Sequence, residues 1–259
     1  MLLTSTAPTT ANPENPIAVM QRFELKYILS PAQAALLKRA MDGRMEPDRY
    51  GLTSIASLYY DTPDNQLIQT CLEKPLFKEK LRLRSYGQAT ESSPVFLELK
   101  RKAEGIVYKR RVQTTVRQAA GFLAGTKSLD DSDQISRELT AFRDFYKNLV
   151  PACLIIYDRT AYVEREGDLR LTIDNNPRYR VDHLTLTHSM EGISLLPPGY
   201  SILELKVQNA MPLWLARALS EAHIYKTSFS KYGEAYRRAH RPEPESGRQN
   251  APGFFPLAI

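Results

Sequence analysis

Basic residues recur two positions apart along this chain, alternating with large apolar residues, in most of its strand-like segments. The clearest examples are Lys80-Leu-Arg82-Leu-Arg84, Phe96-Leu-Glu98-Leu-Lys100 and Ile202-Leu-Glu204-Leu-Lys206. In a β-strand, residues i and i+2 lie on the same face. Each of these segments therefore predicts a strand that has one apolar face and one charged face.

The apolar residues in these alternating segments are too numerous to face solvent in so many strands at once. We expect peripheral helices to cover them. A sheet with helices on its apolar side and charges on the other side can close into a barrel with a polar interior. The predicted fold is therefore α+β: an antiparallel, roughly eight-stranded β-barrel tunnel with a basic lumen.

The composition fits an ordinary globular protein, with 42% hydrophobic and 25% charged residues in a chain of 259. A net charge of +6 suits anionic ligands without requiring nucleic acid. The two cysteines, Cys71 and Cys153, exclude a disulfide scaffold and a cysteine-rich metal site. Buried free thiols, no secretory signal and no apolar run of about 20 residues predict a cytoplasmic protein without a membrane span.

One domain is expected over residues 21–240, between a flexible leader at 1–20 and a Pro/Gly-rich tail at 241–259. Periodicity and turn residues predict strands and helices in alternation. The predicted strands are 22–29, 54–60, 80–86, 95–102, 106–114, 152–163, 169–173 and 201–207, with 181–187 as a further candidate. The predicted helices are 30–42, a short one ending at 72, 115–125, 132–147, 211–222 and 228–240.

Three strands carry a glutamate two residues before a lysine: Glu24, Glu98 and Glu204. Carboxylates among cations weaken anion binding unless they hold a hard divalent metal that itself bridges phosphate oxygens. For any one strand taken alone, a solvated charged face is the favoured explanation of the alternation. Its recurrence over several strands favours a shared site for a polyanion.

Seven motifs in order give the chain a resemblance to a known family. It resembles the VTC domain, the polyphosphate polymerase module of the vacuolar transporter chaperone complex, within the CYTH/triphosphate tunnel metalloenzyme superfamily. The resemblance spans about Arg22 to Arg238. Its motifs are Arg22-Phe-Glu24-Leu-Lys26-Tyr27, Ser57-Leu-Tyr-Tyr60-Asp61-Thr62-Pro63, Leu81-Arg82-Leu-Arg84-Ser-Tyr-Gly87, Phe96-Leu-Glu98-Leu-Lys100, Tyr157-Asp-Arg159-Thr-Ala-Tyr162, Leu203-Glu204-Leu-Lys206 and Phe229-Ser230-Lys231-Tyr232.

The resemblance implies a tunnel lined by phosphate-binding residues and a divalent metal, Mn²⁺ or Mg²⁺, with Glu204 as its principal ligand. The implied catalytic residues are Lys26, Arg82, Arg84, Lys100, Arg159 and Arg170. The implied phosphate-binding residues are Lys109, Tyr157, Lys206, Ser230, Lys231 and Lys226, and the implied metal ligands are Glu204, Glu98 and Glu24.

Two positions distinguish this chain within that superfamily. A basic residue that the family can carry shortly before the Ser-Lys pair is Ser228 here, and Lys226 is the candidate substitute. The opening Glu-x-Glu-x-Lys motif of the superfamily begins with Arg22, as in VTC-type members. This second departure argues against a generic adenylate cyclase or thiamine triphosphatase.

The implied reaction transfers the terminal phosphoryl group of ATP to a polyphosphate chain and releases ADP. Such a transfer requires mainly alignment and charge neutralisation, and the chain has no P-loop or Gly-x-Gly-x-x-Gly motif.

The expected partners are ATP, inorganic polyphosphate and, at the inner face of a membrane, a membrane-protein partner. A triphosphate or polyphosphate hydrolase and a non-catalytic polyphosphate-binding module remain alternatives. Nucleic-acid binding ranks last, because the basic residues alternate with apolar core residues rather than with exposed aromatics.

Other candidate residues add little chemistry. The four histidines lack metal-ligand spacing. Asp174 is predicted to cap a turn before Asn175, with a second metal carboxylate as the alternative. Trp214 is predicted to pack in the core from an amphipathic helix.

Overall fold

The computed structural model describes residues 22–104, 106–129, 133–208 and 210–241, so the predicted leader and, except for residue 241, the predicted tail lie outside the described residues. None of the helices in these ranges has the length and apolar character needed to cross a bilayer. The elements, in chain order, are β1 (Arg22–Leu29), α1 (Pro31–Met41), β2 (Met45–Asp61), α2 (Gln66–Leu72), β3 (Phe77–Tyr86), β4 (Pro94–Ala103), β5 (Ile106–Thr115), α3 (Val116–Leu123), α4 (Gln134–Tyr146), β6 (Val150–Glu164), β7 (Arg170–Arg180), β8 (Ile193–Ser194), β9 (Ser201–Gln208), α5 (Leu213–Glu221), β10 (Lys226–Thr227) and α6 (Lys231–Ala239).

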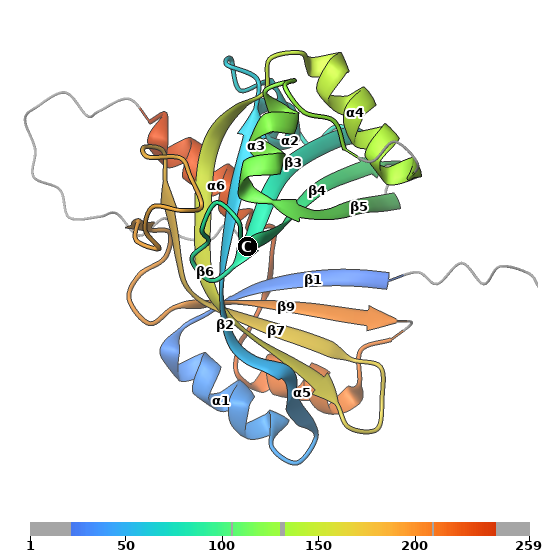
Figure 1. Ribbon diagram of the computed structural model, residues 1–259. Helices are drawn as coiled ribbons and strands as arrows, with labels where there is room; N and C mark the ends of the chain where they lie inside the picture. Colours follow the sequence, from blue (N-terminus) through green and yellow to red (C-terminus); the bar gives the residue numbers. More distant parts are fainter. Residues whose placement is uncertain (1–21, 105, 130–132, 209, 242–259) are drawn as a thin grey trace, which may run out of the picture.

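The strands form one antiparallel sheet in the order β10-β1-β9-β7-β6-β2-β3-β4-β5, with β8 paired to β7. Two long strands, β2 with 17 residues and β6 with 15, run through the middle of this sheet. They connect a half that contains β1, β9 and β7 to a half that contains β3, β4 and β5 (Figure 1). We refer to these as the β1 half and the β3 half.

Helices cover the outer, apolar face of each half. In the β1 half, Leu203 and Leu205 pack in one core with Leu37 of α1 and Leu215 of α5. The corresponding core of the β3 half joins β3 and β4 to α3 and α4 through buried residues that include Leu81, Leu97, Phe122 and Phe142. The expectation that helices cover the alternating apolar residues is therefore confirmed.

A third core lies on the opposite, inner face of β2 and β6. There α2 and α6 pack against the two long strands through residues that include Tyr59, Ile68, Ile155 and Tyr232. This packing places the N-terminus of α6, which follows Ser230, beside the charged faces of both halves. The third core was not predicted, because it joins β2 and α2 to β6, β7 and α6, which are distant from them in sequence.

The α+β class and the antiparallel pairing are confirmed, whereas two details of the predicted barrel are corrected. The described residues form ten strands rather than about eight, because β8 and β10 are pairs of residues too short for a periodic signal. Among them, no backbone pairing joins β5 at one end of the sheet to β10 or β1 at the other. Side chains of the strands next to the two ends approach each other instead, with Lys100 Nζ of β4 4.0 Å from Glu24 Oε2 of β1.

The element boundaries differ from the prediction mainly in β2 and β7. The structure extends β2 back to Met45, and β7 continues to Arg180 through Pro177, past the Asn-Asn pair that predicts a turn. The predicted strand at 181–187 is wrong, because this segment consists of bends and irregular backbone. Helix α1 begins as predicted: Ser30 accepts a hydrogen bond from the Gln33 amide in a capping box, with Pro31 at the first helical position.

Candidate functional site

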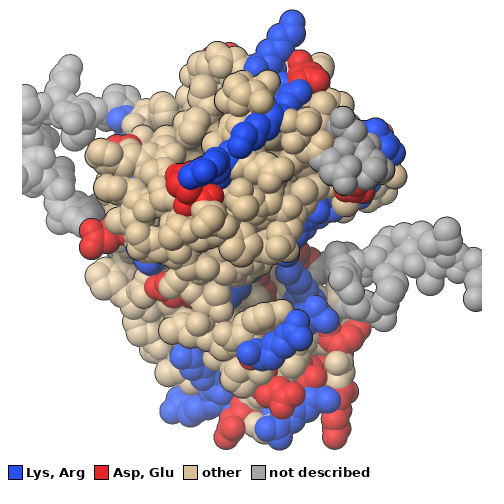
Figure 2. Space-filling model, viewed as in Figure 1, with Lys and Arg blue, Asp and Glu red and all other residues tan. Residues whose placement is uncertain are grey.

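Most of the predicted charged site residues lie on the inner face of the sheet, the face that bears Lys26, Glu204 and Arg82. Cross-strand register establishes this in the β1 half, where Lys26 lies opposite Glu204 and Glu204 lies opposite Thr172. In Figure 2, blue Lys and Arg side chains gather at the right of the view, between the two halves of the molecule. The inner face thus concentrates positive charge between the halves.

Glu204 is the centre of a cluster of ion pairs in the β1 half, which we call the Glu204 cluster. Lys26 Nζ lies 3.2 Å from its carboxylate, Arg159 Nη2 lies 3.4 Å away and Lys231 Nζ lies 3.8 Å away. Burial favours a raised pKa for Glu204, but Lys231, Lys26 and Arg159 lower it well below its usual range. Glu204 is therefore ionised and surrounded by cations from β1, β6 and α6.

Asp174 belongs to the same cluster, so its predicted role as a turn cap is wrong. It lies inside β7 and is fully buried. Its carboxylate accepts hydrogen bonds from Arg159, with Nε at 2.6 Å from Oδ1, and from Lys231. Asp174 therefore orients Arg159 and Lys231, both of which also contact Glu204.

Glu98 is the centre of a second cluster, the Glu98 cluster, in the β3 half. Arg82 Nη2 lies 2.7 Å from its carboxylate, and Lys109 Nζ lies 3.1 Å away. Arg111 Nε lies 3.4 Å away, and Arg84 Nε lies 3.8 Å away. Burial opposes ionisation, but Arg82, Arg84 and Lys109 together hold the pKa of Glu98 at about 2. Four cations thus share one carboxylate.

Tyr157 connects the two clusters. Its hydroxyl accepts a hydrogen bond from Arg84 at 3.2 Å, and its ring lies 4.4 Å from Lys231 Nζ and 5.2 Å from Arg159 Cζ. A cation within about 6 Å of an aromatic centroid is attracted to the ring face. The structure therefore places Tyr157 between basic residues of the two clusters.

The remaining predicted cations lie nearer to solvent. Arg170 and Lys206 are directly opposite each other and exposed, beside a cavity of about 510 Å³ that also contacts Asp48 and Thr172. Lys100 is about half exposed and contacts Glu24 across the ends of the sheet. These three residues are therefore exposed inner-face cations that lie outside the two buried clusters.

The two residues predicted near α6 have different positions. Ser230 caps α6, since its Oγ accepts a hydrogen bond from the Gly233 amide at 3.2 Å, and it lies beside the clusters. Lys226 pairs with Tyr27, whose side chain is in the outer core of the β1 half. The register therefore places Lys226 on the outer face, and the structure does not bring it together with the other predicted site residues.

Three inner-face residues absent from the predicted site are Lys80, Tyr59 and Arg111. Lys80 Nζ donates to Ser230 Oγ at 3.4 Å, and Tyr59 Oη accepts from Arg82 at 3.0 Å. Burial favours a raised pKa for Tyr59, but Arg82, Lys80 and Arg84 lower it to about 8. Lys80 and Arg111 could have been found by extending the two-residue period from Arg82 and Lys109.

The carboxylates differ in how well they suit a divalent metal. Glu24 and Glu204 both contact Lys26 Nζ, at 3.1 and 3.2 Å, and so lie close together on adjacent strands. Thr172 Oγ1, opposite Glu204 in register, is buried without a hydrogen-bond partner among the described residues. No group of three or more His, Cys, Asp or Glu side chains converges in the described ranges. This donor set fits an ion that uses one or two carboxylates and takes its other ligands from phosphate and water.

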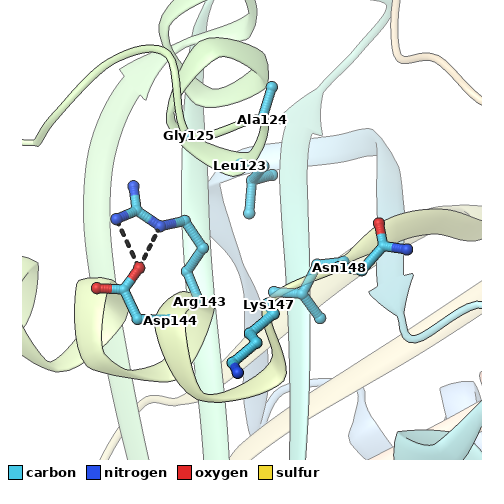
Figure 3. A pocket seen from close by; sticks show the side chains of 8 residues that line it. Leu123, Ala124, Gly125, Arg143, Asp144, Lys147 and Asn148 are labelled. Carbon is cyan, nitrogen blue, oxygen red and sulfur yellow. Dashed lines mark hydrogen bonds and ion pairs between the residues drawn. The ribbon is translucent and has the colours of Figure 1, made fainter.

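A separate pocket of about 410 Å³ lies between the ends of α3 and α4, away from the inner face (Figure 3). In this pocket the Arg143 guanidinium forms an ion pair with Asp144 at 2.7 Å and donates a hydrogen bond to the Phe122 carbonyl at 3.2 Å. The charge of Arg143 is therefore already matched within the protein, and this pocket adds nothing to the candidate site.

Comparison with known proteins agrees with the fold and with the motifs. The family model described as the VTC domain matches residues 21–240. A solved structure from Hippeastrum, described as a candidate adenylyl cyclase with a dominant triphosphatase activity, is similar to this chain with a TM-score of 0.50 and 17% identity, covering 88% of this chain and 100% of that one. A solved structure of a candidate adenylate cyclase from Bacillus halodurans has a TM-score of 0.48 and 14% sequence identity to this chain, and the match covers 80% of this chain and 92% of that one. No curated protein matches the sequence.

Proposed function

Because the chain belongs to the VTC-domain family, we propose that it is a metal-dependent polyphosphate polymerase. It transfers the terminal phosphoryl group of ATP to a growing polyphosphate chain and releases ADP. The observation that carries the proposal is the convergence of cations from β1, β3, β5, β6 and α6 on two clusters joined by Tyr157. Such an arrangement can neutralise several adjacent phosphates at once.

The proposed roles follow from the contacts. Arg82, Arg84 and Arg159 present planar guanidinium groups, which suit bidentate contact with phosphate oxygens, whereas Lys26 and Lys231 supply adaptable point charges. Each is already oriented by Glu98, Glu204 or Asp174. The protein thereby fixes the transferring group in line with the acceptor, which is the main requirement of phosphoryl transfer.

The acceptor needs no separate general base in this proposal. A phosphate oxygen at the end of the chain is already anionic and attacks the terminal phosphorus of ATP, while the bond from that phosphorus to the bridging oxygen of ADP breaks. The leaving ADP retains that oxygen and its electron pair. Lys and Arg side chains of both clusters stabilise the charge that develops on the transferring and leaving oxygens.

Glu204 and Glu24 are the proposed protein ligands of Mn²⁺ or Mg²⁺, which would supply further neutralisation of phosphate charge. Glu98 is the third predicted ligand, but it is enclosed by four cations and lies in the other half of the sheet. We therefore propose that Glu98 mainly positions Arg82, Arg84 and Lys109.

ATP and inorganic polyphosphate are the proposed partners, and the membrane-protein partner expected from the resemblance remains a proposal. The inner-face aromatics speak against nucleic acid. Tyr59 is stacked on Tyr232 with ring centroids 4.4 Å apart, and Tyr157 is covered by Lys231. Neither ring is open for base stacking, which single-strand binding uses.

A single assay tests the proposal. Purified protein is incubated with ATP and Mn²⁺, and the products are examined for polyphosphate ladders and ADP. We expect chain growth that is lost in Glu204→Gln and Arg82→Ala and retained in Glu221→Gln and Arg39→Ala, which remove matched charges from exposed helix positions. Free phosphate without chains would instead indicate a hydrolase, in line with the triphosphatase activity described for the Hippeastrum protein. Tight polyphosphate binding without turnover would indicate a binding module.

A further inference from the structure

Three lysines lie side by side on the inner face of the β3 half. Lys80 on β3 is directly opposite Lys100 on β4, and Lys100 is directly opposite Lys109 on β5. Like charges directly opposite each other destabilise a sheet. The neighbouring inner-face row is different, since there Glu98 separates Arg82 from Arg111. The lysine row therefore has a like-charge repulsion that its neighbour avoids.

Two of these lysines are compensated by carboxylates from outside the row. Lys109 Nζ lies 3.1 Å from Glu98, and Lys100 Nζ lies 4.0 Å from Glu24. Among the described residues, no carboxylate lies within ion-pairing distance of Lys80; its polar contact is the Ser230 hydroxyl at 3.4 Å. Its other neighbour is the Tyr232 ring, 5.8 Å from Nζ.

The surroundings of Lys80 make this uncompensated charge costly. Burial, reinforced by the charges of Lys100 and Lys26, lowers the pKa of Lys80. Nearby Tyr59 and Tyr232 are both buried and stacked on each other. A partly buried ammonium of this kind is stabilised when an anion is placed against it. Lys80 Nζ also lies at the N-terminus of α6, where Ser230 precedes Lys231.

We propose that Lys80 is a further phosphate-binding residue. Beside Ser230, which the resemblance already implies as one, it binds a phosphate group of inorganic polyphosphate at the place where α6 covers the inner face. This inference rests on the proposed function and deepens it. Other cations of the two clusters must first separate from a carboxylate to bind phosphate fully, whereas Lys80 is available without that step. Because the adjacent tyrosines are buried, this end of the site takes a phosphate group rather than a nucleoside.

The test is calorimetric titration of the full chain with tripolyphosphate, and separately with ADP, without metal. We expect Lys80→Met to weaken tripolyphosphate binding about tenfold to a hundredfold, as for loss of a charge-assisted hydrogen bond. ADP binding should change less than threefold. The control Lys38→Met, which removes an exposed charge from α1, should bind both ligands like the wild type.

Thermal unfolding without ligand separates a binding role from a structural one. Since Lys80 faces Lys100 and lacks a carboxylate partner, Lys80→Met should unfold at the same temperature as the wild type or higher. A lower unfolding temperature together with unchanged tripolyphosphate affinity would show that Lys80 is structural and overturn the inference. Equal losses for ADP and tripolyphosphate would overturn the assignment to the inorganic chain. A wild-type protein that binds no tripolyphosphate would overturn the proposed function as well.

Discussion

Lys231 Nζ lies 4.4 Å from the centroid of the Tyr157 ring, whose hydroxyl accepts a hydrogen bond from Arg84. Lys231 contacts Glu204, and Arg84 contacts Glu98, so a single tyrosine touches a cation of each cluster. Because these cations come from α6 and β3, Tyr157 couples the position of a helix to that of a strand on the opposite side of the site.

Substitutions of Tyr157 should separate its two contacts. Tyr157→Phe keeps the ring and loses the hydroxyl, so kcat/KM for ATP should fall about threefold. Tyr157→Leu also loses the ring, and contacts of about 1–2 kcal/mol with partly buried cations correspond to a further fall of about tenfold. Steady-state kinetics with ATP measures both. Equal activity of the two variants would show that the ring contact contributes nothing.

Glu204 and Glu98 should respond differently to metal. We expect Glu204→Gln to weaken Mn²⁺ binding, measured calorimetrically with tripolyphosphate present, about tenfold or more, because Glu204 is a proposed ligand. Glu98→Gln should leave Mn²⁺ affinity within about threefold of the wild type, since its carboxylate is occupied by cations. A large loss of metal affinity in Glu98→Gln would restore Glu98 as a ligand.

Without metal, the same two variants should behave alike. Removing either carboxylate leaves cations without their partner, so tripolyphosphate should bind more tightly in both, by about threefold to tenfold at low salt. Glu221→Gln, at an exposed end of α5, provides the matched control. Weaker binding in Glu204→Gln without metal would mean that Glu204 orients its cations more than it competes with phosphate.

The two-residue period was sufficient to predict the charged strand faces, whereas the individual site residues came from the resemblance. The period placed Lys26, Arg82 and Glu204 on such faces, and register confirms that these faces lie on one side of the sheet. The same period could not show which charges pair, since Glu98 meets Lys109 and Arg111 only through the pairing of β4 with β5. Pairing partners are a property of the sheet and not of any strand alone.

Two other positions were missed for different physical reasons. Asp174 precedes an Asn-Asn-Pro segment that has strong turn propensity, yet β7 continues through it because β6 pairs with β7 both before and after that segment. The other edge of β7 pairs with β9 before the segment and with β8 after it. Lys226 lies in a two-residue strand whose register is set by β1, so its face could not be read from its own sequence. In both cases tertiary pairing overrides the local signal.

Asp174 should stabilise the fold as well as the site. Breaking a buried ion pair by removing one partner costs about 3–5 kcal/mol. Since Arg159 and Lys231 retain contact with Glu204, we expect Asp174→Asn to lower the free energy of unfolding by about 3 kcal/mol. Urea denaturation measures this change. Asp144→Asn, at an exposed ion pair with Arg143, should change it by at most about 1 kcal/mol. Similar values for the two variants would contradict the anchoring role of Asp174.

Tyr59 should ionise at a lower pH than an ordinary tyrosine. Although burial favours its neutral form, Arg82, Lys80 and Arg84 lower its pKa to about 8. The absorbance of tyrosinate should therefore show one transition near pH 8, absent in Tyr59→Phe and retained in Tyr108→Phe, which removes an exposed tyrosine.

The folded-state pKa of Tyr59 lies below the unfolded value of about 10. The associated stability is fully present above pH 10 and is lost as the pH falls through 8. Between pH 8 and pH 10 the free energy of unfolding of the wild type should rise by at most about 3 kcal/mol, and Tyr59→Phe should lack this rise. A wild-type transition that begins only near pH 10 would show that the three cations do not act on this hydroxyl.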